Sequence, residues 1–193
     1  MRSWLPTARS ASFALLLLSL PGCGFLFRSS RLPDLGIVPP FHLHSQTGQM
    51  FHKDKQLGDR VWVADFIFTN CPGPCPRMTQ HMRWLEENTK NLENVRFVSF
   101  TVDPKRDTPA VLSAYARTFG ADTSRWFFLT GPADELQRLS RDVFKLGDIA
   151  PDFEHSTRFV LVDRHGHIRG YYGTTNPTFR TRLLDDIKDL AKN

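Results

Sequence analysis

Hydrophobic and polar positions along the chain predict an alternation of buried strands and helices. Residues 61–68 (VWVADFIF), 95–102 (VRFVSFTV) and 126–129 (WFFL) are short runs of mainly apolar residues, rich in β-branched and aromatic types, which are typical of buried strands. Segment 77–91 carries apolar residues at helical spacing, and segment 109–119 begins with a proline behind a threonine cap. Strands that alternate with helices predict a sheet whose central strands are parallel.

The hydrophobic pattern also predicts elements before and after these alternating strands and helices. Two short apolar runs, 41–43 and 50–51, flank a turn and predict an N-terminal hairpin. Further elements follow the last central strand: a helix over 133–143, strands 157–162 and 168–172 around a turn at 163–167, and a helix over 179–190. The predicted class is α/β, a thioredoxin-like fold with a mixed, mainly parallel central sheet, the hairpin extension and helices on both faces.

The first residues have the order of a secretory signal. Arg2 and Arg9 form a basic start, residues 13–20 are apolar, and a proline and a glycine precede Cys23. The apolar run is shorter than the roughly 20 residues that span a bilayer. Residues 20–23 (LPGC) resemble a bacterial lipobox, in which the cysteine is acylated and becomes the mature N-terminus. The alternative is an ordinary signal peptide that is cut nearby.

This start divides the chain into three parts. We expect residues 1–22 to be a lipoprotein-type signal peptide, 23–38 a lipid anchor and linker, and 39–193 the thioredoxin-like domain. Lipid on Cys23 would hold the protein at a membrane, since each buried methylene contributes about 0.8 kcal/mol. We expect the periplasmic side of the bacterial cell envelope, with membrane anchoring through Cys23 or, alternatively, secretion to the periplasm.

Composition and charge argue against a nucleic-acid partner. The chain has 193 residues, of which 40% are hydrophobic, as fits one compact domain. Its formal charge is +5, from 25 Lys and Arg against 20 Asp and Glu. Loss of Arg2 and Arg9 leaves 23 against 20, a net charge of about +3. This weak positive bias does not indicate binding to nucleic acid.

Two cysteines need a chemical explanation. If Cys23 carries lipid, Cys71 and Cys75 remain in an oxidising compartment, where thiols persist only if paired, metal-bound or kept reduced by a partner. They follow a buried strand and precede a helix, where backbone N–H groups and the helix dipole favour thiolates. A Pro-Gly-Pro turn between them would bring both sulfurs to one side of the helix, close enough to bridge each other or to hold one ion.

A thiolate pair favours a soft metal, Cu(I) foremost, and a neutral imidazole would also tolerate Cu(II). His155 is the best third ligand, because it precedes strand 157–162, where thioredoxin-like folds bring a loop over the cysteines. A redox dithiol, a structural disulfide and a zinc site are alternatives, although zinc in a structural site prefers four ligands. We interpret the remaining histidines as solvated and Met78 and Met82 as core residues.

Three blocks of sequence resemble the SCO/SenC family of copper-binding assembly factors. Residues 68–76 (FTNCPGPCP) are similar to its cysteine loop, 101–109 (TVDPKRDTP) to its acidic loop and 154–156 (EHS) to its histidine loop. The resemblance covers the chain from about residue 39 to its end. It implies a metallochaperone that holds copper, as Cu(I), Cu(II) or both, through two cysteines and one histidine. It also implies a role in assembling the binuclear copper centre of cytochrome c oxidase.

The resemblance has further implications for the site and its partners. It implies a carboxylate near the metal, which we assign to Asp103, and we assign Asp107 to the loop or helix start. Partners would be the copper-bearing subunit of cytochrome c oxidase or another copper protein, together with other copper chaperones or thioredoxin-like reductants. The alternative function is a thiol–disulfide oxidoreductase whose redox pair, Cys71 and Cys75, keeps the target's copper-ligand cysteines reduced.

Overall fold

The computed structural model describes residue 1, residues 32–149 and residues 156–192. These residues form a seven-stranded sheet in the order β2-β1-β5-β4-β3-β6-β7. Its strands are β1 (His42–Ser45), β2 (Met50–His52), β3 (Val61–Ile67), β4 (Val95–Thr101), β5 (Trp126–Thr130), β6 (Arg158–Val162) and β7 (Ile168–Gly173). The helices are α1 (Lys53–Leu57), α2 (Pro74–Asn88), α3 (Pro109–Thr118), α4 (Ala133–Arg138), a π-helical turn η1 (Leu139–Val143) and α5 (Phe179–Ala191).

The sheet is mixed, and parallel pairing is confined to its three central strands. Strand β4 lies parallel to β3 on one side and to β5 on the other. Antiparallel strands continue the sheet beyond both, with β1 against β5 and β6 against β3. The predicted N-terminal hairpin is present as β1 and β2. The thioredoxin-like class with a mixed sheet and a hairpin extension is therefore confirmed. The prediction that the sheet is mainly parallel is wrong, because four of the six strand pairings in the described residues are antiparallel.

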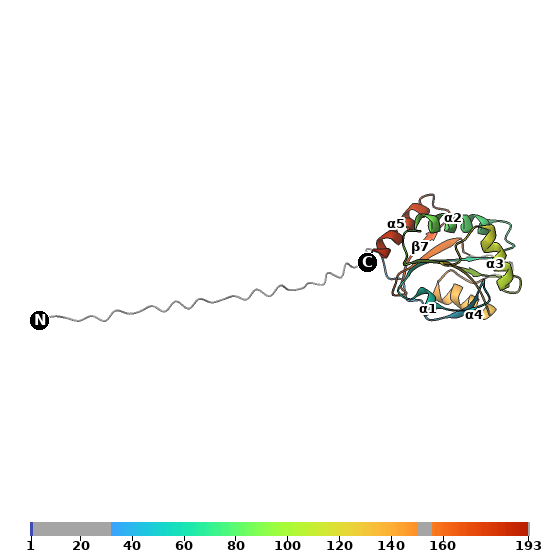
Figure 1. The fold of residues 1–193 in the computed structure, drawn as a ribbon, viewed down its shortest axis with the longest axis horizontal. Helices are drawn as coiled ribbons and strands as arrows, with labels where there is room; N and C mark the ends of the chain where they lie inside the picture. Colours follow the sequence, from blue (N-terminus) through green and yellow to red (C-terminus); the bar gives the residue numbers. More distant parts are fainter. Residues whose placement is uncertain (2–31, 150–155, 193) are drawn as a thin grey trace.

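Helices cover both faces of the sheet and define two cores. Helices α2, α3 and α5 lie on one face, and α1 and α4 lie on the other (Figure 1). Alternate residues of β3 serve the two cores: Val61, Val63 and Ile67 pack on the α2 side, and Trp62, Ala64 and Phe66 pack on the α1 side. Burial on both faces explains why this strand reads as a continuous apolar run.

Most element boundaries agree with the sequence pattern, and the exceptions have local causes. Helix α2 begins at Pro74, earlier than the predicted residue 77, because Pro74 and Pro76 fit a first turn that needs no N–H donors. Helix α3 begins behind the predicted cap, where the Thr108 hydroxyl accepts a hydrogen bond from the Val111 N–H at 3.4 Å. The predicted helix over 133–143 is continuous, but its second half has π geometry.

The segment before β1 is attached to the domain. The Leu35 N–H donates to the Ile168 carbonyl at 2.9 Å, and the Ile168 N–H donates to the Gly36 carbonyl at 2.8 Å. The Val38 N–H donates to the Gly166 carbonyl at 2.8 Å. Residues 35–38, which the sequence assigns to the linker, therefore pair with the start of β7.

Several predicted features lie outside the described residues. These are the signal segment, Cys23 and His155. Within the described part of the chain, no helix is long and apolar enough to cross a membrane.

Met82 tests the packing of α2 on the sheet. Its side chain is fully buried in the core on the α2 side. Met82→Ala should lower the free energy of unfolding by about 2–5 kcal/mol, because it removes buried methylene and sulfur contacts and leaves a cavity. Urea unfolding of the reduced protein measures this change. Met50→Ala is the matched control at an exposed position and should change stability by no more than about 0.5 kcal/mol.

Candidate metal centre

The two cysteines meet at the junction of β3 and α2. The backbone turns after β3, where the Cys71 N–H donates to the Phe68 carbonyl at 3.3 Å. The Cys75 N–H then donates to the Cys71 sulfur at 3.5 Å, so that the sulfur lies over the first turn of α2. Both side chains are buried, and no disulfide joins them. The sequence therefore brings the two thiols together as predicted.

The pKa of the buried Cys75 thiol is raised, so this thiol keeps its proton at neutral pH. Desolvation raises the pKa of Cys75, and the adjacent Cys71 thiol and the charge of Asp65 raise it further, against a backbone hydrogen bond at Phe68. The expectation of a thiolate at both positions is thus wrong for Cys75, because burial outweighs the helix N-terminus. A metal that binds this sulfur must displace its proton.

Asp65 is a buried acid beneath the cysteine loop. It lies in β3 between Val63 and Ile67, so it faces the same core as both cysteines. Neither of its carboxylate oxygens has a hydrogen-bond partner of good geometry among the described residues. Burial raises the pKa of Asp65 to about 7, and the Ser99 hydroxyl opposite it on β4 tempers the rise. Asp65 therefore titrates near neutral pH.

A pair of hydroxyls ties the first turn of α2 to α3. The Thr79 hydroxyl donates to the Cys75 carbonyl at 3.0 Å and lies 2.8 Å from the Tyr115 hydroxyl. Burial raises the pKa of Tyr115, with smaller contributions from Asp65 and the cysteines. This phenol stays protonated at neutral pH and holds the helix that carries Cys75 in place.

The acidic loop reaches the cysteine loop through Asp107. Its fully buried carboxylate accepts hydrogen bonds from the Thr69 N–H at 3.1 Å, the Thr69 hydroxyl at 2.5 Å and the Thr101 hydroxyl at 2.5 Å. Asp103 is also buried, and its carboxylate accepts from Arg106 Nε at 3.3 Å. The carboxylate bound to the cysteine loop is therefore Asp107, which the sequence reading left without a role at the site. The assignment of Asp103 as the acid near the metal stays a prediction.

The cysteine pair suits a soft metal. Its two sulfurs are adjacent, buried and not oxidised to a disulfide, which is the donor chemistry that Cu(I) prefers. Within the described ranges, no group of three or more His, Cys, Asp or Glu side chains is arranged to hold a metal ion. The predicted third ligand, His155, lies outside these ranges.

The histidines interpreted as solvated have different surroundings. His81 is partly buried, its ring meets Phe179 at 5.1 Å between centroids, and desolvation lowers its pKa. His167 Nδ1 lies 2.8 Å from the Asp34 carboxylate. His165 is exposed at the predicted hairpin turn. The solvated interpretation is therefore wrong for His81 and accurate for His165.

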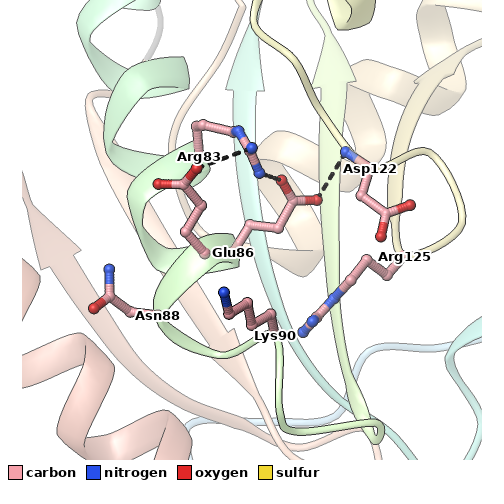
Figure 2. A pocket seen from close by; sticks show the side chains of 7 residues that line it. Arg83, Glu86, Asn88, Lys90, Asp122 and Arg125 are labelled. Atoms are coloured by element: carbon pink, nitrogen blue, oxygen red, sulfur yellow. Dashed lines mark hydrogen bonds and ion pairs between the residues drawn. The ribbon is translucent and has the colours of Figure 1, made fainter.

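An open pocket of about 620 Å³ lies at the far end of α2 from the cysteines. Figure 2 shows Glu86 between the Arg83 guanidinium and the Asp122 backbone, to which it is bound at 2.6 Å and 3.1 Å. Arg125 Nη2 donates to the Thr89 carbonyl at 3.1 Å. These charged groups are bound to each other and to the backbone around β5, so we assign them a structural role and not a ligand-binding one.

A smaller pocket of about 230 Å³ lies beside the cysteine loop. Its lining comes from the start of α2 and the segment after β7, namely Pro74, Arg77, Met78, His81, Thr174 and Thr175. Pro74, which directly precedes Cys75, contributes to this lining, so the hollow adjoins the start of α2.

Comparison with known proteins places the fold and the cysteine loop in one family. The family model described as SCO1/SenC matches residues 30–192. The chain belongs to the SCO1/SenC family. The sequence resemblance is thereby confirmed over nearly the whole domain.

Three solved structures of this family are similar to the chain. A SCO1/SenC family lipoprotein of Bacillus anthracis is 36% identical, with a TM-score of 0.74 over 82% of this chain and 97% of that one. BsSco, described as a member of the Sco family of cytochrome c oxidase assembly proteins with a disulfide switch, is 32% identical, with a TM-score of 0.74 over 83% and 97%. Yeast Sco1 with copper bound is 27% identical, with a TM-score of 0.65 over 83% and 90%.

Asp65 is a site residue to which the sequence analysis gave no role. Its run was interpreted as apolar on both faces, although an acid stands in the middle of it. The signal was available, because a carboxylate is almost never fully buried without a partner or a function.

Asp65→Asn tests the buried acid through the pH dependence of stability. The folded pKa near 7 exceeds the ordinary value of 3.8, so the acid is tolerated when protonated and costs stability once it ionises. Stability should be fullest below about pH 4 and should fall as pH rises to about 8, by up to the order of 4 kcal/mol. Asn cannot ionise and should remove this fall in urea unfolding of the reduced, metal-free protein.

Asp185→Asn, at an exposed position of α5, is the control for this measurement. It should keep the pH profile of the unmodified chain. Parallel profiles for Asp65→Asn and the unmodified chain would contradict the assignment.

Asp107→Ala should destabilise the junction of the cysteine and acidic loops. It removes three hydrogen bonds to a buried carboxylate and leaves the Thr69 and Thr101 donors unsatisfied. A loss of about 3 kcal/mol in the free energy of unfolding is expected. Thermal or urea unfolding measures it, and Asp148→Ala, an exposed acid, should cost less than about 1 kcal/mol.

Proposed function

We propose that this chain is a copper metallochaperone that assists assembly of the binuclear copper centre of cytochrome c oxidase. In this proposal Cys71 and Cys75 bind the ion as thiolates, and His155 supplies a neutral imidazole as the third ligand. The observation that carries it is the buried approach of the Cys75 N–H to the Cys71 sulfur, within a chain of the SCO1/SenC family. Copper in yeast Sco1 supports the same choice of metal.

Copper is cargo in this function, and the chain's residues control its release. Binding must displace the proton of the buried Cys75 thiol, so protons compete with copper for this sulfur. Thr79 and Asp107 fix the helix and the loop that carry the sulfurs, which keeps the two donors on one side of the ion. An acceptor protein would take the ion by thiolate exchange at the end of α2 that carries the cysteines.

The alternative is a thiol–disulfide oxidoreductase that keeps the target's copper-ligand cysteines reduced. Two adjacent thiols without a disulfide also suit this chemistry, and the disulfide switch described for BsSco supports it. Asp65, with its pKa near 7 and its charge coupled to Cys75, would then exchange protons with the buried thiol.

Location at a membrane is a further part of the proposal. The lipobox-like residues before Cys23 and the lipoprotein of Bacillus anthracis support lipid anchoring on the periplasmic side of the bacterial envelope. An anchor would keep the copper donor close to a membrane-bound acceptor and raise its effective concentration.

Anaerobic titration of the reduced protein with Cu(I) and Cu(II) tests the ligand set. The unmodified chain should bind one equivalent of Cu(I) at the cysteine pair, and one equivalent of Cu(II) there with sulfur coordination in its electronic spectrum. Cys71→Ser and Cys75→Ser should each abolish stoichiometric Cu(I) binding, because a hydroxyl is a poor ligand for a soft ion. His155→Ala should weaken Cu(II) binding at least about tenfold, while His165→Ala should not change it.

The same variants separate the two functions. If His155→Ala leaves copper affinity unchanged and only alters the rate of thiol exchange with a model disulfide, the oxidoreductase function is supported instead. Failure of the reduced, unmodified chain to bind Cu(I) stoichiometrically, together with Cu(II) binding that shows no sulfur coordination, would overturn the chaperone proposal.

A further inference from the structure

The N-terminal hairpin presents three histidines and a methionine on one exposed face. Strands β1 and β2 pair so that His42 lies opposite His52 and His44 lies opposite Met50. The residues between them, Leu43 and Phe51, point into the core on the α1 side. His42 and His44 are exposed, His52 is partly exposed, and Met50 is 47% exposed. Nitrogen and thioether donors thus share a patch of four side chains, the hairpin patch.

The register brings these side chains close together. Backbone hydrogen bonds join Ser45 to Gln49 and Lys53 to Phe41 across the hairpin, at 2.9 Å and 3.1 Å. Hydrogen-bonded and non-hydrogen-bonded pairs alternate along an antiparallel ladder, so the His42 and His44 pairs are both of the non-hydrogen-bonded kind. In such pairs the α-carbons are only about 4.5 Å apart, and side chains approach most closely.

The two opposed imidazoles already have the spacing of metal ligands. His42 Nδ1 and His52 Nδ1 are joined by a hydrogen bond of 2.8 Å, whose proton an ion would displace, and the ring centroids are 4.7 Å apart. Two nitrogens bound at about 2.0 Å and at right angles around one ion are also about 2.8 Å apart. Right angles between neighbouring ligands are typical of tetragonal Cu(II) and Ni(II) sites, whereas tetrahedral Zn²⁺ requires a wider spacing.

The hairpin is held firmly enough to keep this spacing. The Gln46 side chain accepts a hydrogen bond from the Phe128 N–H at 3.0 Å, which ties the turn to β5. The Ser45 and Thr47 hydroxyls lie 2.8 Å apart within the turn, and Gly48 adopts φ +79°, which favours glycine. The His52 N–H donates to the Gln56 side chain at 2.9 Å. Both strands are therefore fixed before any ion arrives.

The geometry points to a second metal site, in which His42 and His52 chelate one divalent transition-metal ion of the Cu(II) class. His44 and Met50 are the further donors that a change of rotamer would bring to the ion. Strand β1 lies three strand spacings, or about 14 Å, from β3, which leads to the cysteine loop. The hairpin patch is therefore separate from the cysteine pair and does not depend on the function proposed for it.

The test uses the full chain with Cys71→Ser and Cys75→Ser, so that the cysteine pair no longer binds copper. Titration with Cu(II) against a glycine competitor should find one bound equivalent with a tetragonal electron paramagnetic resonance spectrum and nitrogen coupling. His42→Ala and His52→Ala should each weaken binding at least tenfold, and together they should abolish it. His165→Ala, at an exposed turn, is the matched control and should bind like its parent.

Two results would overturn this inference. One is the absence of a bound equivalent in the parent protein, and the other is unchanged affinity in the protein that lacks both His42 and His52. All substituted histidines lie at least partly exposed, and circular dichroism of each variant checks that the fold is kept.

Discussion

The close approach of two buried sulfurs at the start of one helix is the constraint on which the rest of the site depends. A loop of only a few residues must leave β3, present Cys71, and begin α2 so that Cys75 N–H points at the first sulfur. Pro74 and Pro76 allow the helix to start there without unsatisfied donors. Cys75 is then fully enclosed by the core, and Cys71, which is 9% exposed, is the more accessible of the two.

Two buried carboxylates near the start of α2, Asp107 and Asp65, have opposite effects on the stability of the fold. The Asp107 carboxylate accepts three hydrogen bonds and links the cysteine loop to the acidic loop. Asp65 is the opposite case, a buried acid without a good hydrogen bond, and its charge contributes to the raised pKa of Cys75. A core that keeps an unsatisfied acid under a pair of thiols gives up stability for electrostatic control at that point.

Sequence reasoning found the elements because each carried a clear local signal. Residue type and spacing predicted the apolar strand before Cys71, the capped start of α3 and the turn of the β6–β7 hairpin. The roles of Asp65 and Asp107 were missed because they arise from which loops meet in space. The opposed histidines of the β1–β2 hairpin were missed for the same reason, since pairing register is not visible in a run of exposed residues.

The pairing of residues 35–38 with the start of β7 fixes where the preceding chain leaves the domain. It leaves at the β7 edge of the sheet, and β2 forms the opposite edge. The lipid anchor proposed at Cys23 would therefore be attached to the domain at its β7 edge. The β2 edge lies six strand spacings, up to about 29 Å, from that edge. The β1–β2 hairpin that carries His42, His44 and His52 would then lie at the margin of the sheet farthest from the proposed anchor.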